Sequence, residues 1–411
     1  MNQPLDTTKG WEAPFLRGMI AIDDGDEIRE VLSAAQFAPM GADGRPFYYD
    51  NVIATLDGPE HIHRRRIANR VFLEGPLKDY MDSVYTPVLD LCLAELQGQR
   101  GPDGLIHADL MPLGWRVLVR FSLRILGLDG DEDQTRLDEV VTIIQVLSEA
   151  LVSEWSTNAE ALVRAARKAE AEFKEHVFLP SVARRRAAVA RVRAGTMPRS
   201  ALRMDLITTL LLEETLDWTD DALFGEITMI LSAASGSSVQ GLPHFLTHLE
   251  EWFAAHPEDR QRALDDPDFL RNASHEALRL FVSTPARIRV CTADVTLSTG
   301  RQIRAGEKVA VLFLPPNTTS EEFGAEPGTF DPYRKPADSP WGLSFGYGRH
   351  ACMGRRLVTS STQHGRDGTM AAVLRRLYES GVRMDTDRPV RIDETSFKRL
   401  WISMPIVFER L

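Results

Sequence analysis

The chain has 411 residues, 43% of them apolar, which is ample for a large buried core. Its 48 basic and 59 acidic side chains give a formal net charge of −11, and this acidic balance argues against a general nucleic-acid-binding protein. The three cysteines, Cys92, Cys291 and Cys352, lack the spacing of a metal finger or a disulfide framework, which favours a reducing compartment.

No linker rich in Gly, Ser or Pro and no low-complexity run divides the chain, so we expect a single domain over residues 1–411. Residues 1–12 are polar and lack the apolar centre of a signal peptide. Nowhere do roughly 18 uncharged apolar residues run together, as a membrane-spanning helix requires. These features predict a soluble, cytoplasmic protein with neither a membrane nor a nucleic acid as partner.

The first predicted elements are short. Residues 18–22 predict a strand, and residues 26–35 predict a helix with one apolar face. Residues 37–55 form a loop rich in aromatic and chain-breaking residues. Two interpretations of this loop stay open, because its aromatic side chains could either fill the core or line a binding pocket. These side chains are Phe47, Tyr48 and Tyr49.

Residues 57–66 predict a turn that leads into a helix, with Pro59 placed near the first helical turn. His61 and Arg65 are four residues apart and therefore share one face of this helix. The forked donors of an arginine suit an oxygen-anion partner. Taken alone, however, the pair could also belong to a solvated basic face.

The middle of the chain is mostly helical by its apolar period, and it leads to one long helix that begins at Thr219. Small and hydroxyl residues at positions 233–238, Ala234 among them, interrupt the apolar stripe of that helix and let another body approach it. The preceding helices are predicted over residues 84–96, 113–126, 137–151, 159–185 and 205–214.

Further along, Glu276 and Arg279 sit one helical turn apart and can pair, although many exposed helices carry this spacing by chance. The next segment predicts strands over residues 282–289, 295–298 and 308–312, with a hairpin at Gly300. After residue 361, positions 362–369 precede a helix over residues 370–377, and the chain ends in strands between residues 392 and 407.

Residues 345–354 read Phe-Gly-Tyr-Gly-Arg-His-Ala-Cys-Met-Gly, with three glycines around Cys352 just before a helix-like run over residues 355–358. A thiolate is a strong metal ligand, and free backbone N–H groups lower the pKa of a cysteine. The glycines let the backbone take positive φ and lie against a flat ligand. The alternative is a buried, inert cysteine of the common kind.

This pattern, Phe-Gly-x-Gly-x-His-x-Cys-x-Gly, resembles the cysteine-ligand signature of the cytochrome P450 family and matches every specified position. The resemblance implies a mainly α fold with small β-sheets, a shortened N-terminus and a haem b cofactor. It also implies that Cys352 is the axial ligand of the haem iron, that Phe345 packs near the sulfur, and that His350 reaches a haem propionate. Thiolate ligation favours O–O cleavage.

The resemblance assigns roles to three further positions near the haem. It implies that His61 and Arg65 bind one propionate and that Arg289 is the second propionate arginine. Arg287 is additional, and three roles stay open for it: another propionate ligand, an ordinary salt-bridged arginine, or a clamp for a substrate carboxylate. The family's structural triad would here be Glu276, Arg279 and Arg334, a buried ion network that locks the cysteine loop.

The long helix departs from the family pattern, which places an acid and an alcohol where water is organised for proton delivery. Here Ser237 stands in place of the acid and Ser238 in place of the alcohol. The nearest upstream carboxylate, Glu226, lies about three turns away, and Pro243 removes a helical donor downstream. A water chain held by Ser237, Ser238 and Gln240 is the conservative substitute.

An apolar substrate pocket is implied by the same resemblance, with a mobile lid between residues 140 and 191. A turn at residues 396–398 would reach back into this pocket. The predicted pocket residues are Phe47, Tyr48, Tyr49, Ala234, Val282, Ala286, Arg287, Ile288 and Phe397.

The leading hypothesis is a soluble haem-thiolate monooxygenase that inserts one oxygen atom from O2 into a small apolar organic substrate. Electrons would come from an external ferredoxin and its NAD(P)H-dependent reductase, because the chain carries no redox domain of its own. The altered serine pair motivates an alternative, a peroxide-driven or non-oxygenating haem-thiolate enzyme. A third reading is a non-enzymatic haem- or ligand-binding protein. The expected docking patch is Arg64, Arg66, Arg349, Arg355 and Arg356.

Overall fold

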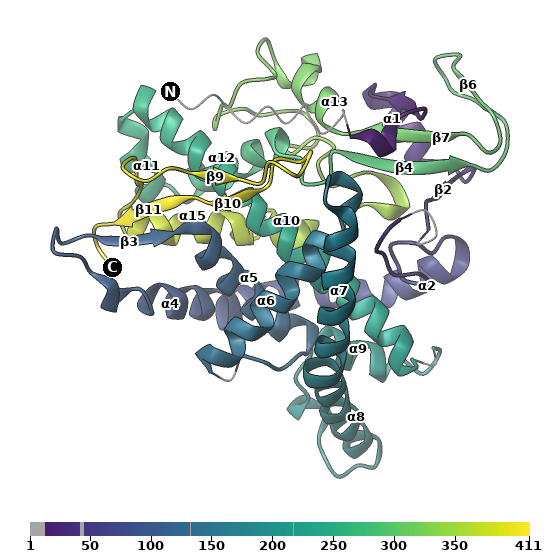
Figure 1. Ribbon diagram of the computed structural model, residues 1–411, viewed down its shortest axis with the longest axis horizontal. Coiled ribbons are helices and arrows are strands. Elements are labelled where there is room, and N and C mark those ends of the chain that lie inside the picture. The colour runs from purple at the N-terminus through teal and green to yellow at the C-terminus, as the bar shows by residue number, and fades with distance from the viewer. Residues whose placement is uncertain (1–12, 42–44, 132, 217) are drawn as a thin grey trace. The chain divides into compact units, whose positions relative to one another are not determined.

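The computed structural model describes residues 13–41, 45–131, 133–216 and 218–411. The polar segment 1–12, where we expect no signal peptide, and residues 42–44 of the aromatic loop lie outside the described residues. Helices dominate, and the strands within the described residues form four small sheets, so the predicted mainly α fold with small β-sheets is confirmed (Figure 1).

The chain divides into two compact units. Unit 1 takes the described residues of Met1–Met40, Leu89–Leu113 and Ser237–Leu411, and unit 2 takes those of Gly41–Val88 and Gly114–Gly236. The helices α4 (Thr86–Ala94), α5 (Leu110–Leu126) and α10 (Asp220–Ala255) each begin in one unit and end in the other. The expectation of a single domain stays a prediction.

The largest sheet of unit 1 has the strand order β1-β7-β4-β2. β1 runs parallel to β7, whereas β4 is antiparallel to both of its neighbours. Ile22, Phe37 and Val309 from this sheet join Ile28 and Val31 of α1 (Gly25–Ser33) in one apolar core. The strands are β1 (Ile20–Ile22), β2 (Phe37–Pro39), β4 (Ala286–Cys291) and β7 (Lys308–Leu312).

Three smaller sheets complete unit 1. One has the order β3-β11-β8, and two are hairpins that pair β9 with β10 and β5 with β6. Their strands are β3 (Ile106–Asp109), β5 (Val295–Thr296), β6 (Gln302–Ile303), β8 (Val382–Met384), β9 (Arg391–Ile392), β10 (Trp401–Ser403) and β11 (Pro405–Phe408). The helices are α1 (Gly25–Ser33), α11 (Glu258–Asp265), α12 (Pro267–Leu280), α13 (Leu314–Thr319), α14 (Arg355–Val358) and α15 (Thr369–Glu379).

Unit 2 is helical. The predicted helix over residues 159–185 is helical throughout, but a π-helical turn, Lys174–Phe178, divides it into two helices that follow one another in Figure 1. Aspartate side chains cap the helices that begin at Gln134 and Leu206, since Asp133 accepts the N–H of Arg136 and Asp205 accepts that of Thr208. The helices are α2 (Gly58–Ala68), α3 (Glu74–Tyr80), α6 (Gln134–Ala150), α7 (Ala159–Phe173), α8 (Leu179–Arg193) and α9 (Leu206–Leu212).

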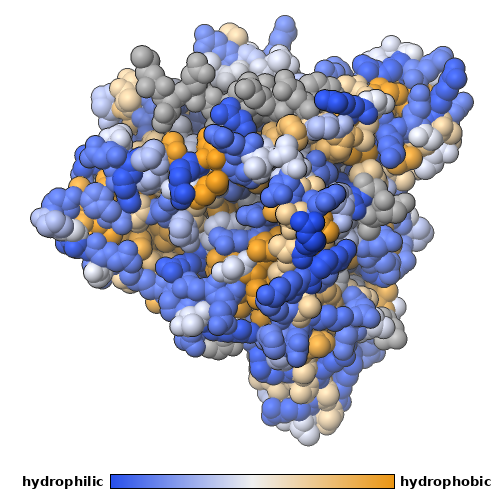
Figure 2. All heavy atoms as spheres, viewed as in Figure 1, coloured by the Kyte–Doolittle hydropathy of each residue, from blue (hydrophilic) through white to orange (hydrophobic). Residues whose placement is uncertain are grey.

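Among the described helices, α10 has the length and the apolar composition that could cross a bilayer. This is weak evidence for a membrane span, because a buried helix of a globular core passes the same test and 56% of the apolar window is buried. The helix continues through Pro243. On the face drawn in Figure 2, hydrophilic residues predominate and hydrophobic ones gather only in small groups.

Candidate haem-thiolate site

The loop that carries Cys352 is held in a tight conformation within unit 1. The Cys352 N–H donates to the carbonyl oxygen of Phe345 at 2.8 Å, which closes the loop on itself. Gly346 and Gly348 adopt φ of 69° and 68°, a region that favours glycine. A Cβ on Gly348 would lie 2.8 Å from the Leu32 carbonyl oxygen at the end of α1, so no larger residue fits there.

Arg349 fastens the same loop to α1. Its guanidinium donates to the carbonyl oxygens of Ser33 at 3.1 Å and Ala34 at 3.3 Å, the C-terminal carbonyls that a helix leaves without partners. Arg349 therefore has a structural role. Its guanidinium is used within the protein, which leaves fewer arginines for the predicted docking patch. α14 begins at Arg355, as the sequence predicts, and is a single turn long.

Cys352 is exposed, whereas Cys92 and Cys291 are buried. The alternative of a buried, inert Cys352 is therefore wrong. An accessible thiol in a glycine-rich loop whose backbone can approach a flat ligand has the donor and the clearance that a haem iron ligand requires. The residues of this loop fit a thiolate-ligated haem.

A buried ion network supports the loop. Arg279 donates to both carboxylate oxygens of Glu276, at 2.8 and 2.6 Å, and Arg334 donates to one of them at 2.9 Å. The side chain of Arg279 is fully buried and that of Glu276 is 4% exposed. The backbone N–H of Asp331 adds a further donor at 3.1 Å. The three predicted triad residues thus lie together, and each charged side chain has a partner of opposite charge.

Asn317, which the sequence analysis missed, joins this network to the loop. Its amide nitrogen donates to the Arg279 carbonyl oxygen at 2.9 Å and to the Ser344 hydroxyl at 2.8 Å. Its amide oxygen accepts the N–H of Leu343 at 2.8 Å. Gly342 is needed beside it, because a Cβ there would lie 2.2 Å from that oxygen. No local pattern marks Asn317, since all of these partners are distant in sequence.

The other side of the loop rests on aromatic rings. Phe345 meets Trp341 edge to face at 6.0 Å, and Trp341 meets His275 of α12 at 5.2 Å. His275 is buried, and desolvation lowers its pKa to about 4, so its neutral ring accepts the Ser360 N–H at 3.0 Å. This contact anchors residues 359–368, the segment that separates α14 from α15.

β4 places the predicted arginines on one face and the apolar residues on the other. Side chains alternate along a strand, so Arg287 and Arg289 share a face, and Ala286 and Ile288 lie opposite. Arg289 is buried, Arg287 is half-buried, and both apolar residues are buried. Arg287 therefore cannot line one surface together with Ala286 and Ile288, which corrects their grouping in one pocket.

The serine positions lie in the part of α10 that belongs to unit 1. Ser237 and Ser238 are half-buried. Gln240 does not fit the predicted water chain, because its amide is used by β10: it donates to the Trp401 carbonyl oxygen at 3.0 Å and accepts the Trp401 N–H at 2.7 Å. This pairing ties the β9–β10 hairpin, whose turn holds the half-buried Phe397, to α10.

Unit 2 holds the other predicted site residues. On α2, His61 is buried and Arg65 is half-buried. Arg64 was expected in a docking patch, but it is buried and pairs with Glu60 at 2.5 Å and with the Asn51 carbonyl oxygen at 2.8 Å, so this expectation is corrected. Arg66 is exposed.

The aromatic loop residues favour the core interpretation. Phe47 and Tyr49 are 1% and 8% exposed and meet edge to face at 5.7 Å. Tyr49 also meets Phe224 of α10 at 6.3 Å, and Arg167 of α7 lies over the Phe47 ring at 4.8 Å. Burial raises the pKa of Tyr49, with Glu170 adding to the effect. Within unit 2, these two residues fill an aromatic core and do not line an open cavity.

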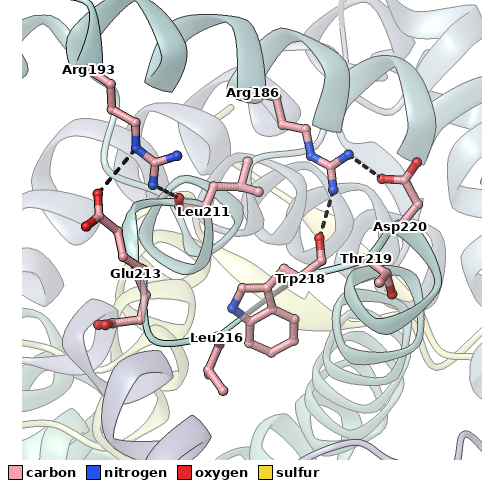
Figure 3. Close-up of a pocket in the computed structure, with 9 residues that line it drawn as sticks. Arg186, Arg193, Leu211, Glu213, Leu216, Trp218, Thr219 and Asp220 are labelled. Carbon is pink, nitrogen blue, oxygen red and sulfur yellow. Dashed lines mark hydrogen bonds and ion pairs between the residues drawn. The ribbon is translucent and has the colours of Figure 1, made fainter.

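A groove of about 680 Å³ opens between α8, α9 and the start of α10 in unit 2 (Figure 3). Arg186 crosses it to pair with Asp220 at 2.8 Å, and Arg193 donates to the Leu211 carbonyl oxygen at 3.0 Å. Arg186 belongs to the segment 140–191 that was predicted as a lid, but none of the individually predicted haem or substrate residues lines this groove.

Comparisons with known proteins support the family resemblance. The family model described as Cytochrome P450 matches residues 17–363. The chain is 26% identical over 397 residues to a steroid C26-monooxygenase of Mycolicibacterium smegmatis, which covers 94% of this chain and 86% of that protein.

Two solved structures share the fold. The mycinamicin VIII C21 methyl hydroxylase MycCI from Micromonospora griseorubida, bound to mycinamicin VIII, superposes with a TM-score of 0.70 at 18% identity, over 98% of this chain and 96% of that chain. P450BioI, in complex with an acyl carrier protein ligated to hexadec-9Z-enoic acid, gives a TM-score of 0.71 at 17% identity, over 98% and 99%. The chain belongs to the cytochrome P450 family, and it is a haem-dependent monooxygenase and therefore an oxidoreductase.

Proposed function

We propose that this protein holds haem b through Cys352 and hydroxylates a small apolar organic substrate with electrons from an external ferredoxin, in the cytoplasm. The observation that carries the proposal is the exposed thiol of Cys352 in a loop fixed by Gly348, Arg349 and Asn317. Bound through this thiolate, the haem iron would supply the activation of O2. The protein's own residues position that chemistry.

Each residue has a limited task in this proposal. Cys352 would bind the haem iron through its thiolate, with Phe345 beside the sulfur. His350 and Arg289 of unit 1 would bind propionates, and Arg287 would join them, because it shares the β4 face of Arg289. His61 and Arg65 of unit 2 stay predicted propionate ligands on the strength of their spacing.

Ser237 and Ser238 would hold the water that supplies protons for the reduction of O2. Neither serine is acidic, so the water itself must relay the proton between hydroxyl groups. Replacing Ser238 by Ala should divert reducing equivalents into peroxide and lower the product formed per NAD(P)H. Thr319→Ala, whose hydroxyl donates to the Pro315 carbonyl oxygen in α13, is the control and should leave this ratio unchanged.

The substrate is expected to carry an apolar skeleton, as the name of the steroid C26-monooxygenase relative suggests. A titration of the purified ferric protein with steroids, fatty acids and aromatic acids tests this expectation. A ligand that displaces water from the iron shifts it from low to high spin. If steroids and fatty acids leave the spin state unchanged and only small polar acids shift it, the proposed substrate class is wrong.

A second candidate function follows from the serine pair, which lacks the carboxyl group of the family pattern. The protein would then use peroxide or catalyse a reaction that needs no external electrons. Turnover of a substrate identified by titration, measured with NAD(P)H, ferredoxin and reductase or with peroxide alone, separates the two. Product that requires the reductase supports the monooxygenase, and equal product without any reductant supports the alternative.

A further inference from the structure

One carboxylate in unit 1 joins two oxidisable aromatic side chains. Asp259, at the start of α11, accepts the indole N–H of Trp252 on one oxygen at 2.9 Å and the phenol O–H of Tyr333 on the other at 2.5 Å. The two rings lie 6.1 Å apart, centre to centre. Asp259 is 3% exposed, whereas Tyr333 is 42% exposed, so the group connects the interior with the surface.

The carboxylate is suited to accept a proton from either ring. Burial alone would raise the pKa of Asp259, but the hydrogen bonds from Tyr333 and Trp252 outweigh it, and the pKa lies below its ordinary value. Arg262 pairs with Asp259 at 3.1 Å and also donates to the Tyr333 oxygen. A phenol or indole that loses an electron becomes strongly acidic, so a fixed carboxylate lowers the barrier to its oxidation.

Trp252 also has aromatic neighbours near α10. It shares a stripe of α10 with His244 and His248, at spacings of four residues. His248 stacks on Phe330 at 5.1 Å, and Phe330 meets Trp252 at 6.2 Å. His244 accepts the indole N–H of Trp401 at 3.2 Å. Aromatic contacts therefore connect Trp252 through Phe330 to His248, whereas His244 belongs to a second group with Phe281 and Trp401.

We propose that Trp252, Asp259 and Tyr333 form a one-electron relay through which oxidising equivalents leave the protein at its surface. Tyr333 gives an electron to oxidised Trp252 and its phenolic proton to Asp259. The products are reduced Trp252, protonated Asp259 and a neutral Tyr333 radical. An external thiolate or ascorbate then gives one electron to Tyr333, Asp259 returns the phenolic proton, and any proton that the reductant loses goes to solvent. The relay rests on the proposed function in one respect only, because the bound haem would be the source of its oxidant.

The first experiment supplies the oxidant from outside. Photogenerated tris(bipyridine)ruthenium(III) oxidises the purified holoenzyme, and transient absorption with electron paramagnetic resonance reports the radicals. The wild type should give a tyrosyl radical whose formation slows in D2O, because the proton moves with the electron. Tyr333→Phe should lose most of that signal. Asp259→Asn keeps the shape but removes the base, so the yield should fall about tenfold, as expected for one charge-assisted hydrogen bond.

Tyr347 is the matched control. It is 43% exposed, and the described residues offer it no hydrogen-bonded carboxylate. Tyr347→Phe should keep the wild-type radical yield. The relay is overturned if Tyr333→Phe keeps the signal, if Tyr347→Phe loses as much, or if the D2O effect is absent. Unfolding midpoints of all variants separate these outcomes from a loss of folding, since the radical readout is made only on folded protein.

The second experiment mixes the ferric holoenzyme with peroxide and traps radicals by rapid freezing. A Tyr333 radical here connects the relay to the haem. If the ruthenium oxidant yields the radical but peroxide yields none in protein with a normal thiolate spectrum, the link to the haem is wrong. Protein that lacks a thiolate spectrum would count against the proposed function, while the ruthenium result would still decide the relay.

Discussion

The two parts of α10 enclose titratable groups of opposite kinds. In unit 2, Glu226 is 1% exposed and accepts the Ile53 N–H at 3.0 Å, and burial raises its pKa to about 7. In unit 1, His244 and His248 are stacked on Phe281 and Phe330, and desolvation lowers their pKa values to about 3 and about 4. Burial favours the neutral form of the groups in both parts, but it raises the pKa of the carboxyl group and lowers the pKa values of the imidazoles.

One continuous helix can therefore give the stabilities of its two units opposite dependences on pH. A carboxyl group with a raised pKa destabilises its unit as the pH rises, because the folded state must keep a proton that the unfolded state releases. An imidazole with a lowered pKa destabilises its unit as the pH falls, because only the unfolded state can gain the proton. Four variants test these buried groups and their partners.

The largest expected effect comes from Arg279→Met in unit 1. The change leaves the Glu276 carboxylate buried without its bidentate partner, so the free energy of unfolding should fall by about 3–5 kcal/mol. Urea denaturation of the holoenzyme at pH 7 measures it. Arg164→Met on the exposed face of α7 is the control and should change stability by less than about 0.5 kcal/mol. A loss of similar size in both variants would contradict the account of the buried network.

Glu226→Gln tests unit 2. The wild-type carboxyl group has a pKa of about 7 folded and 4.5 in its ordinary state, so stability should fall as the pH rises from about 4.5 to 7. The amide keeps an acceptor for Ile53 without titrating. At pH 8 the variant should therefore be about 3 kcal/mol more stable than the wild type.

Denaturation curves from pH 5 to pH 8 measure this difference. Glu160→Gln, whose side chain is 95% exposed, should follow the wild type throughout. A Glu226→Gln protein whose stability keeps the wild-type pH slope would show that the carboxyl group is not the source of that slope.

His248→Phe tests unit 1 in the acid range. Protonation of the unfolded state starts below the ordinary pKa of 6.5, while the folded ring stays neutral until about 4. The contribution of the neutral ring to the free energy of unfolding is therefore fully present above pH 6.5. It is lost between pH 6.5 and 4, by about 2 kcal/mol for this partly exposed ring. The phenyl ring keeps the stacking on Phe330 and removes that loss. His364→Gln, on an exposed turn, is the control, and an unchanged acid slope in His248→Phe would contradict the assignment.

The smallest effect is expected for Trp401→Phe. It removes the indole N–H that donates to His244, which should cost about 1 kcal/mol. It should also raise the pKa of His244, because the ring nitrogen becomes free to bind a proton. Proton NMR titration of the His244 ring measures the shift. Ile402→Ala, exposed on the same strand, should leave that pKa in place; an equal shift there would point to a general change in β10.

The cysteine loop was predictable because its information is local. Gly346, Gly348 and Cys352 lie within a few residues, and the φ values of the glycines express what their spacing implies. The bounds of α14 follow from the same stretch. The network of Glu276, Arg279 and Arg334 was predictable only through the family resemblance, because Glu-x-x-Arg by itself does not distinguish a buried pair from an exposed one.

The features that escaped prediction depend on pairing between distant segments. Asn317 joins Arg279 to Leu343, and Gln240 pairs with the backbone of Trp401, 161 residues away. Nothing around Gln240 distinguishes a side chain that binds backbone from one that holds water. The aromatic loop shows the same limit, since Phe47 and Tyr49 have the composition of a pocket but the packing of a core.

The absorption spectrum of the reduced, carbon monoxide-bound protein shows whether Cys352 binds the haem iron. The wild type, Cys92→Ala and Cys291→Ala should all give the red-shifted Soret band of a thiolate-ligated haem, because both of those cysteines are buried in the structure. Cys352→Ala should lose that band while the folded protein remains. A Cys352→Ala protein that retains the thiolate band would contradict the assignment of Cys352 as the iron ligand.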